Sequence, residues 1–298
     1  MNRTLWGIIC LSAAASIWGG VYVVSKYVLD YIPPFTLLWM RYVIAVLVLG
    51  AVMVSLKQHR IDWKDWKLFA GVGFVGYFVS VGTQFIGTKL SDAHTGSLIT
   101  ATSPIFVLLL ARFMLKEALT LRKVLALAVS FAGMVIVIGW NSSGEENLTG
   151  NLVLIVAAVT WALLSVMAKQ AAAHYTVLTV TTYALLFAIL FTTPAMIWEW
   201  STTQISTPFW QDPYLFWGVI YLGTIATAAA FFLWNKGMEL MDAGAGSFFI
   251  FVQPVVGSLL GWLLLNEQIT VNFFIGGLLI AIGVWIVSVV KNQAEPSA

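Results

Sequence analysis

Apolar residues run along this chain in long blocks of about twenty residues, the length that crosses the hydrocarbon core of a bilayer as an α-helix. Short polar or turn-forming stretches separate the blocks. Ten blocks can be counted, with approximate limits at residues 5–28, 34–56, 66–88, 92–115, 120–140, 150–171, 176–198, 213–236, 242–265 and 270–290. The pattern therefore predicts an all-α polytopic membrane protein with ten transmembrane helices.

The composition agrees with lipid as the main solvent. Only 9% of the 298 residues are charged, whereas a soluble domain has roughly 25%. A soluble enzyme is therefore excluded, and the lipid bilayer is the expected partner. The net charge of +2, with no basic stripe, predicts no nucleic-acid partner. The single Cys10 and the three dispersed histidines form no metal-ligand spacing, so neither a metal nor another cofactor is expected.

The basic residues are distributed unevenly between alternate connectors. With the amino terminus in the cytoplasm, twelve of the fifteen fall on the inner side, and only Lys26 and Lys89 fall outside. The inner residues are Arg3, Lys57, Arg60, Lys64, Lys67, Arg112, Lys116, Arg122, Lys123, Lys169, Lys236 and Lys291. This positive-inside bias predicts a multi-pass protein of the cell inner membrane with both termini cytoplasmic.

The second half of the chain repeats the first. Residues 92–97 match residues 242–247 at an offset of 150, and the offset near the start is 143, which aligns Trp18 with Trp161. The predicted domains are residues 1–144 and 145–298, each a repeat of five spans. Because five is an odd number, equivalent helices cross in opposite directions, so the halves form an inverted-topology repeat. That architecture is typical of secondary transporters that work by alternating access.

Several short motifs resemble the EamA-type branch of the drug/metabolite transporter superfamily. They are Trp18-Gly19-Gly20 with Lys26, Ile32-Pro33-Pro34, Arg41, Ser97-Leu98-Ile99 with Pro104, Glu117, Thr120 and Gly133. The resemblance covers nearly the whole chain. It implies a ten-helix, two-repeat transporter of small metabolites, often an exporter of amino acids or related compounds. The second half departs from it at Ala184, which stands where Arg41 would map.

Two prolines occupy equivalent positions near the middle of the fourth and ninth spans, Pro104 and Pro254. Each proline removes a helical hydrogen bond and exposes a carbonyl group. The pairing favours a substrate site at the midplane, with Thr100, Ser103 and Gln253 extending the polar surface. A tolerated kink is the alternative for either proline alone.

Aromatic and polar residues on several spans suggest the walls of such a site. Tyr77, Ser80, Gln84 and Thr88 share one face of the third span. Other candidates are Trp18 and Tyr22 on the first span, Trp161 and Ser165 on the sixth, and Trp234 on the eighth. Aromatic walls with few polar anchors are typical of small-molecule sites. Packing and hydrogen bonding between helices are the alternative interpretation.

Arg41 is the only ionisable residue well inside a span. Burying it costs at least ~2.5 kcal/mol, so it should face protein or water. It is a candidate to hold a substrate carboxylate or to gate the cavity, and the alternative is a bond to backbone carbonyls or snorkelling. No span has Asp or Glu near its centre, which disfavours a proton-driven exporter of organic cations. Glu117 and Glu267 are expected to cap helices or to pair with nearby bases.

These features together predict a secondary transporter of small metabolites, with amino acids or related zwitterions as the substrate and export as the direction. Transport of bulky aromatic or quaternary-ammonium cations is the alternative. A lipid transferase would need clustered carboxylates or a metal site, and a channel would need a continuous polar lining, so neither is favoured. The expected partners are a small-molecule substrate and the bilayer, and the chain is expected to act as a monomer.

Overall fold

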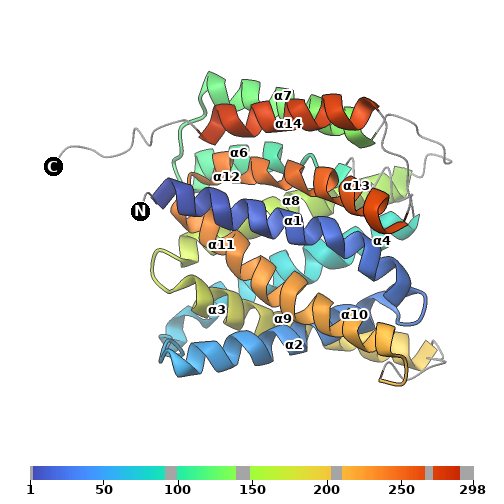
Figure 1. The fold of residues 1–298 in the computed structure, drawn as a ribbon. Helices are drawn as coiled ribbons and strands as arrows, with labels where there is room; N and C mark the ends of the chain where they lie inside the picture. Colours follow the sequence, from blue (N-terminus) through green and yellow to red (C-terminus); the bar gives the residue numbers. More distant parts are fainter. Residues whose placement is uncertain (1–2, 91–98, 139–147, 203–209, 266–270, 289–298) are drawn as a thin grey trace.

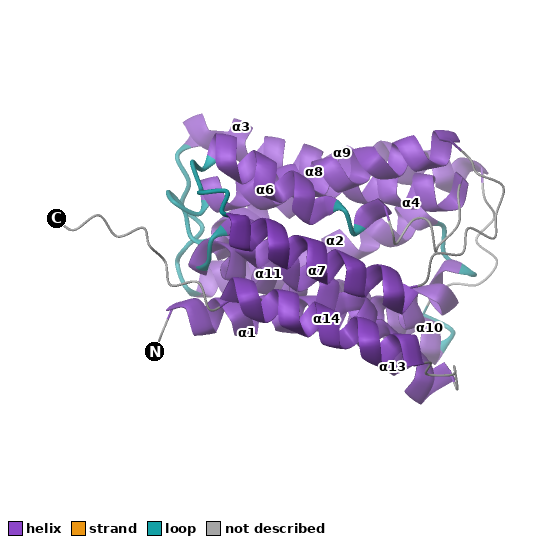
Figure 2. Cartoon of the chain, turned by 90° about the horizontal axis from the view of Figure 1, so that it is seen from above, coloured by secondary structure: helices purple, strands orange, loops and turns teal. Residues whose placement is uncertain are grey.

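The computed structural model describes residues 3–90, 99–138, 148–202, 210–265 and 271–288, and most of these residues are helical. Figure 1 shows the helices packed side by side, and Figure 2 shows most of the described loops at the two ends of the bundle, with one short loop segment inside it. The first helix, α1 (Arg3–Leu29), begins at the end of the bundle where the last, α14 (Val271–Ser288), finishes (Figure 1). We call this the amino-terminal end of the bundle.

The helices follow one another along the chain with only short connectors. After α1, the first half contains α2 (Pro34–Ser55), η1 (Trp63–Asp65), α3 (Trp66–Gly71), η2 (Val72–Ser80), α4 (Val81–Leu90), α6 (Ser103–Met114) and α7 (Leu121–Ile138). Before α14, the second half contains α8 (Leu148–Ala171), α9 (Val177–Thr202), α10 (Pro213–Gly223), η3 (Thr224–Ala229), α11 (Ala230–Leu240), α12 (Ala243–Ser247), η4 (Phe248–Phe251) and α13 (Val252–Leu265).

Each of the ten predicted blocks overlaps helical structure in the described ranges. Seven helical segments are long and apolar enough to cross a membrane. They are Arg3–Val21, Pro34–Ser55, Trp63–Gly87, Leu148–Ala171, Val177–Thr202, Pro213–Leu240 and Ala243–Leu260. Parts of the predicted fourth, fifth and tenth spans lie outside the described residues. The chain is therefore an all-α, multi-pass membrane protein.

The outside of the bundle is apolar, and polar side chains lie inside it. Exposed large side chains include Leu47, Leu190 and Trp285. Buried polar side chains include Ser165, Thr181, Thr192, Thr227 and Asn235. This distribution inverts that of a soluble protein and suits a lipid environment.

Helices α7 and α14, the fifth helices of the two predicted repeats, pack against each other in opposite directions. A Cβ atom added at Gly133 would lie 2.6 Å from the carbonyl oxygen of Gly276, and one added at Gly283 would lie 2.8 Å from that of Ala126. Residue numbers thus rise along α7 while they fall along α14. Glycine permits this approach because any larger residue would overlap the opposite backbone.

Helices α2 and α9, the second helices of the two repeats, are also antiparallel. The backbone N–H of Thr36 donates to Oε2 of Glu199 at 2.8 Å, and Nε1 of Trp39 donates to Oγ1 of Thr193 at 3.0 Å. Two pairs of equivalent helices therefore meet in opposite directions, as an inverted repeat requires.

Two stretches expected to be ordinary α-helix are π-helical, namely η2 and η3. At the repeat offset of 150, η2 maps onto residues 222–230, which contain η3. A π turn leaves carbonyl groups without their usual partners. In η3 the hydroxyl of Thr227 donates to the carbonyl oxygen of Leu222 at 2.7 Å and satisfies one of them. Both repeats therefore carry a widened turn at an equivalent position.

The position of the two prolines corrects the expectation that they interrupt the middle of a helix. Pro104 is the second residue of α6, and Pro254 is the third residue of α13. Proline fits the first turn of a helix because the N–H group there has no intrahelical partner. The breaks come just before the prolines, at residues 101–102 and in the 3-10 segment η4.

Candidate functional site

Four aromatic rings from three helices form a cluster between the two halves. Trp18 of α1 packs edge-on against Trp161 of α8, with ring centroids 5.3 Å apart. Phe231 and Trp234 of α11 each lie 5.4 Å from Trp18, and Trp161 lies 6.1 and 6.0 Å from them. We call these four residues the aromatic cluster. The repeat-related pair Trp18 and Trp161 therefore meets at its centre.

Tyrosines of the first half extend the aromatic cluster. Tyr77, within η2, packs edge-on against Phe231 with centroids 4.7 Å apart. The hydroxyl of Tyr42, on α2, donates to the backbone oxygen of Tyr77 at 2.6 Å. Both tyrosines are fully buried. The widened turn of η2 is thus fixed by a side chain from the neighbouring helix.

The widened turn η3 receives side chains from two other helices. The indole Nε1 of Trp18 donates to the backbone oxygen of Ala226 at 3.0 Å. Nε of Arg41, on α2, donates to the hydroxyl of Thr227 at 3.0 Å. η3 thus holds Trp18 through a backbone carbonyl and Arg41 through a side-chain hydroxyl.

Arg41 is buried, with 8% of its surface exposed. None of the ion pairs among the described residues includes it. A guanidinium group carries five N–H donors, and the hydrogen bond to Thr227 uses one. Arg41 is therefore a buried cation without an ion-pair partner in the part of the chain that the structure describes.

Ser165 anchors the aromatic cluster from α8. Its hydroxyl donates to the backbone oxygen of Trp161 at 3.2 Å and accepts a hydrogen bond from Nε1 of Trp234 at 3.3 Å. The bond to Nε1 limits how far the ring of Trp234 can turn.

The structure thus brings six of the predicted site residues into one connected region, which includes Arg41 through η3. They are Trp18, Arg41, Tyr77, Trp161, Ser165 and Trp234.

Other predicted site residues come from segments that do not contribute to this region. Gln84 is half-buried on α4, and Ser103 is buried at the start of α6. Thr100 is half-buried just before the helix break at residues 101–102. None of the described hydrogen bonds joins Gln84 or Ser103 to the aromatic cluster. Ser80, from the same predicted stripe as Gln84, donates to the backbone oxygen of Ala157 at 3.1 Å, which is a bond between helices.

The proline-bearing helix α13 reaches the region through its backbone. A Cβ atom added at Gly19 would lie 2.8 Å from the carbonyl oxygen of Gln253, so α13 packs closely against α1 beside Trp18. Pro254 follows on the same helix and is half-buried. Pro104 is buried in α6. Tyr22 lies on α1, and its side chain is outside the described part of the chain.

Sequence reasoning missed Asn235, which lies beside the aromatic cluster. Its Nδ2 donates to the hydroxyls of Tyr77 at 3.0 Å and Thr181 at 2.9 Å. The available signal was an amide side chain next to Trp234 and four residues after Phe231, which places it on the same helical face as that ring. The residue has no polar counterpart in the first half, where Phe85 occupies the equivalent position.

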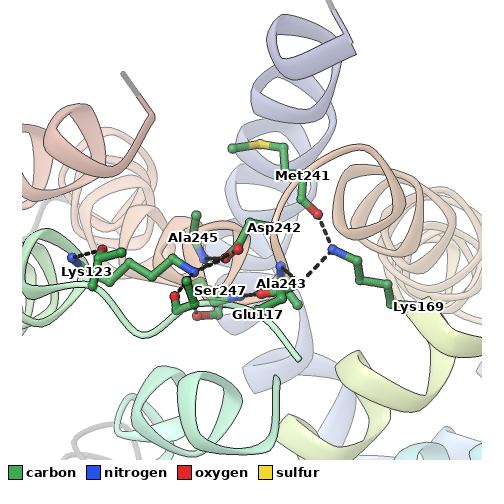
Figure 3. A network of polar contacts seen from close by, with 11 residues as sticks. Glu117, Lys123, Lys169, Met241, Asp242, Ala243, Ala245 and Ser247 are labelled. Carbon is green, nitrogen blue, oxygen red and sulfur yellow. Dashed lines mark hydrogen bonds and ion pairs between the residues drawn. The ribbon is translucent and has the colours of Figure 1, made fainter. Parts of the chain in front are cut away.

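A polar network closes the amino-terminal end of the bundle (Figure 3). Glu117, in the turn after α6, accepts hydrogen bonds from Nζ of Lys169 at 2.9 Å and from the backbone N–H groups of Ala243 and Gly244 at 2.8 and 3.1 Å. Lys169 also donates to the backbone oxygen of Met241. As predicted, Glu117 is both a helix cap and the partner of a base. Lys169 thus joins α8 to the start of α12.

Asp242 continues this network. Its carboxylate accepts from the backbone N–H of Ala245 at 3.0 Å and forms an ion pair with Lys123 at 2.7 Å. Burial alone would raise the pKa of Glu117, but the charge of Lys169 and the hydrogen bonds from the α12 backbone amides keep that pKa below its ordinary value. The network therefore holds Glu117 in its charged form.

Two inverted halves of membrane-crossing helices, meeting at an aromatic cluster, have the architecture of a secondary transporter. The model of the EamA-like transporter family matches the chain twice, over residues 5–139 and 148–289. The chain belongs to this family, and it is a multi-pass membrane transporter.

Several known proteins are similar over nearly the full length. An uncharacterized transporter of Bacillus subtilis, YetK, is 26% identical over 302 residues, covering 99% of this chain and 90% of the relative. A probable amino-acid metabolite efflux pump of Escherichia coli K12 is 24% identical over 276 residues, covering 91% and 90%. One crystal structure superposes with a TM-score of 0.79 at 22% identity and covers 95% of both chains. That likeness supports the fold.

Proposed function

We propose that this transporter exports a small zwitterionic metabolite, an amino acid or a related compound, by alternating access between its two halves. The observation that carries the proposal is Arg41, a buried cation beside η3 without an acidic partner among the described residues. A substrate carboxylate would supply the missing negative charge. Bidentate binding of carboxylates is the task to which a guanidinium group is best suited.

The region around Arg41 matches what a small amphipathic substrate needs. The aromatic cluster offers apolar surface, and the polar groups near it are few. The name of the Escherichia coli relative, a probable amino-acid metabolite efflux pump, points to the same substrate class at 24% identity.

The same residue weighs against the alternative substrate, a quaternary-ammonium cation. Aromatic faces attract such cations by about 2 kcal/mol or more when desolvated. Arg41, however, would repel a cation across a low-dielectric interior, and no described acidic side chain forms an ion pair with it. A net-neutral zwitterion avoids this repulsion because its carboxylate compensates Arg41.

Orientation is part of the proposal. The distribution of Lys and Arg favours a cytoplasmic location for the amino-terminal end of the bundle, in the inner membrane of a bacterial-type cell. The network of Glu117, Lys169 and Asp242 would then close the cytoplasmic side. An outward-releasing state of an exporter would have this closure.

The test is efflux from proteoliposomes loaded with radiolabelled amino acids, with choline-loaded vesicles alongside. We expect amino-acid efflux in the wild-type protein and at least a tenfold loss in Arg41→Gln, since a hydrogen-bonded charge contributes about 1.5–3 kcal/mol. Clear choline flux without flux of any amino acid would disprove the proposal.

Thr227→Val is the matched control for the role of Arg41. It removes the hydroxyl that binds Nε and leaves the guanidinium charge in place. If Arg41 binds the substrate carboxylate, Thr227→Val should retain more amino-acid efflux than Arg41→Gln. Equal loss in both variants would assign Arg41 to structure.

A further inference from the structure

Asn235 has one polar atom that the structure leaves without a partner. Only 4% of the residue is exposed. Its Nδ2 is bonded to the hydroxyls of Tyr77 and Thr181, which fixes the orientation of the amide. Its Oδ1 is buried and accepts no hydrogen bond in the structure.

An orphaned acceptor of this kind is unfavourable in a membrane interior. Leaving a buried acceptor unsatisfied costs free energy that a bond to a donor would recover. The only other buried side-chain atom of the described chain in this condition is Oγ of Ser130, which lies in the α7–α14 contact away from the aromatic cluster. Asn235 belongs to the candidate site because its amide donates to Tyr77, whose ring packs against Phe231 of the aromatic cluster.

The chemistry around Oδ1 favours a protonated amine as its partner. Asn235 follows Trp234 directly and lies one helical turn beyond Phe231. Aromatic faces stabilise an ammonium group, and a carbonyl oxygen accepts one of its N–H bonds. A quaternary ammonium has no N–H bond to donate and would leave Oδ1 unsatisfied.

The spacing along the helix separates this acceptor from Arg41. Thr227, which binds Arg41, and Asn235 are eight residues apart, or about 12 Å along a helix axis. Phe231 lies between them. An α-amino acid carries its ammonium one carbon from its carboxylate, which is too short to reach both groups.

We propose that Asn235 is a specificity-determining residue whose Oδ1 binds the distal ammonium group of a substrate whose carboxylate binds Arg41. The favoured ligand is thus a zwitterion with its charges several bonds apart, as in an ω-amino acid. This inference rests on the proposed function, because it takes the carboxylate site at Arg41 as given. In the present conformation neighbouring helices cover Asn235, so binding accompanies the opening of the halves.

Two isomers test the inference directly. 6-Aminohexanoate and 2-aminohexanoate have the same formula and carboxylate, and they differ in the position of the amine. Binding to the purified full-length protein can be followed by quenching of the tryptophan fluorescence. We expect the wild-type protein to prefer 6-aminohexanoate, and Asn235→Leu to lower this preference about tenfold or more by weakening that isomer alone. N,N,N-trimethyl-6-aminohexanoate should bind wild type as weakly as 6-aminohexanoate binds Asn235→Leu.

Two further variants separate recognition from packing. Asn235→Asp keeps an acceptor oxygen and should keep the preference for 6-aminohexanoate. If Asn235→Leu does not fold, this variant still tests whether an acceptor oxygen at position 235 maintains the preference. Thr181→Val removes a partner of Nδ2 and leaves Oδ1 in place, so it should also keep the preference. Loss of the preference in Thr181→Val equal to that in Asn235→Leu would overturn the proposal.

The outcomes also distinguish this inference from the proposed function. If both isomers bind equally well to the wild-type protein and to Asn235→Leu, the role of Asn235 is disproved and the zwitterion site stands. If neither isomer nor any other amino acid binds or is transported, the proposed function fails and the inference fails with it.

Discussion

Replacing Glu117 with alanine should open the amino-terminal end of the bundle. The carboxylate joins three parts of the chain, because it sits in the turn after α6, pairs with Lys169 of α8 and caps α12. Alanine removes all three accepted hydrogen bonds at once. It leaves the ammonium of Lys169 with the backbone oxygen of Met241 as its remaining partner. We expect the closed arrangement to lose free energy relative to any state in which α12 has moved away.

The size of this loss can be estimated from the contacts. Removing an N-cap side chain costs about 0.5–2 kcal/mol, and a partly exposed ion pair contributes up to about 1 kcal/mol. The side chains of Lys169 and Glu117 are 19% and 12% exposed, so water can replace part of what is lost. A total of about 2 kcal/mol follows, which corresponds to roughly a 30-fold change in an opening equilibrium.

Cysteine labelling measures this equilibrium. Ser247, at the end of α12, is 2% exposed and can be replaced by cysteine in a Cys10→Ser background, which has no other cysteine. A membrane-permeant thiol reagent should then label Ser247→Cys roughly 30-fold faster when Glu117 is replaced by alanine. The rate is proportional to the open population as long as closing is faster than labelling.

A labelling rate that changes less than threefold, in a variant that still elutes as folded protein, would refute the role of Glu117 as a latch. Glu239→Ala is the matched control. Glu239 pairs with Lys236 three residues away on the same helix, and that pair is more exposed. Its loss should alter labelling of Ser247→Cys by less than threefold.

Three further outcomes are expected. Gly133→Val should reduce the yield of folded protein, because its side chain would overlap the backbone of α14, whereas Gly50→Ala, with nothing within 4 Å of its added Cβ atom, should not. Glu199→Ala should lower the thermal midpoint in detergent by the equivalent of about 1–2 kcal/mol, since Glu199 caps the start of α2. Because the pKa of Glu117 is lowered in the folded protein, its charged form stabilises the fold at pH values above the ordinary carboxyl pKa of 4.5. This stabilisation is lost as the pH falls through the folded-state pKa. The thermal midpoint of wild type should therefore fall more steeply below pH 4.5 than that of Glu117→Gln, and parallel curves would contradict this assignment.

The positions of the helices could be predicted from sequence because each span is a long apolar block between polar stretches. The widened turns could not, because a π turn inserts one residue into a segment such as Val72–Ser80 that is mostly apolar. Neither composition nor periodicity marks that insertion. The prolines indicated that two helices are broken, but the breaks precede Pro104 and Pro254, since proline is accommodated in the first turn that follows.

For the candidate site, duplication was an informative signal where the halves are alike. Trp18 and Trp161 were paired by the repeat offset, and their rings are in contact. The same method overlooked Asn235, because an internal comparison emphasises what the halves share. Its partner Thr181 is likewise an ordinary residue in sequence, and burial alone makes its hydroxyl significant.

The repeat also has a consequence for the shape of the substrate. Two identical halves related by a two-fold axis would create a site whose ends are interchangeable, suited to a ligand that is the same from either end. Here Arg41 corresponds to Ala184, and Asn235 corresponds to Phe85. The widened turns and the tryptophan pair keep the symmetry of the repeat, whereas in the proposed site these two divergent positions would bind two different chemical groups of the substrate. A substrate of this kind would therefore bind in a single orientation relative to the two-fold axis that relates the halves.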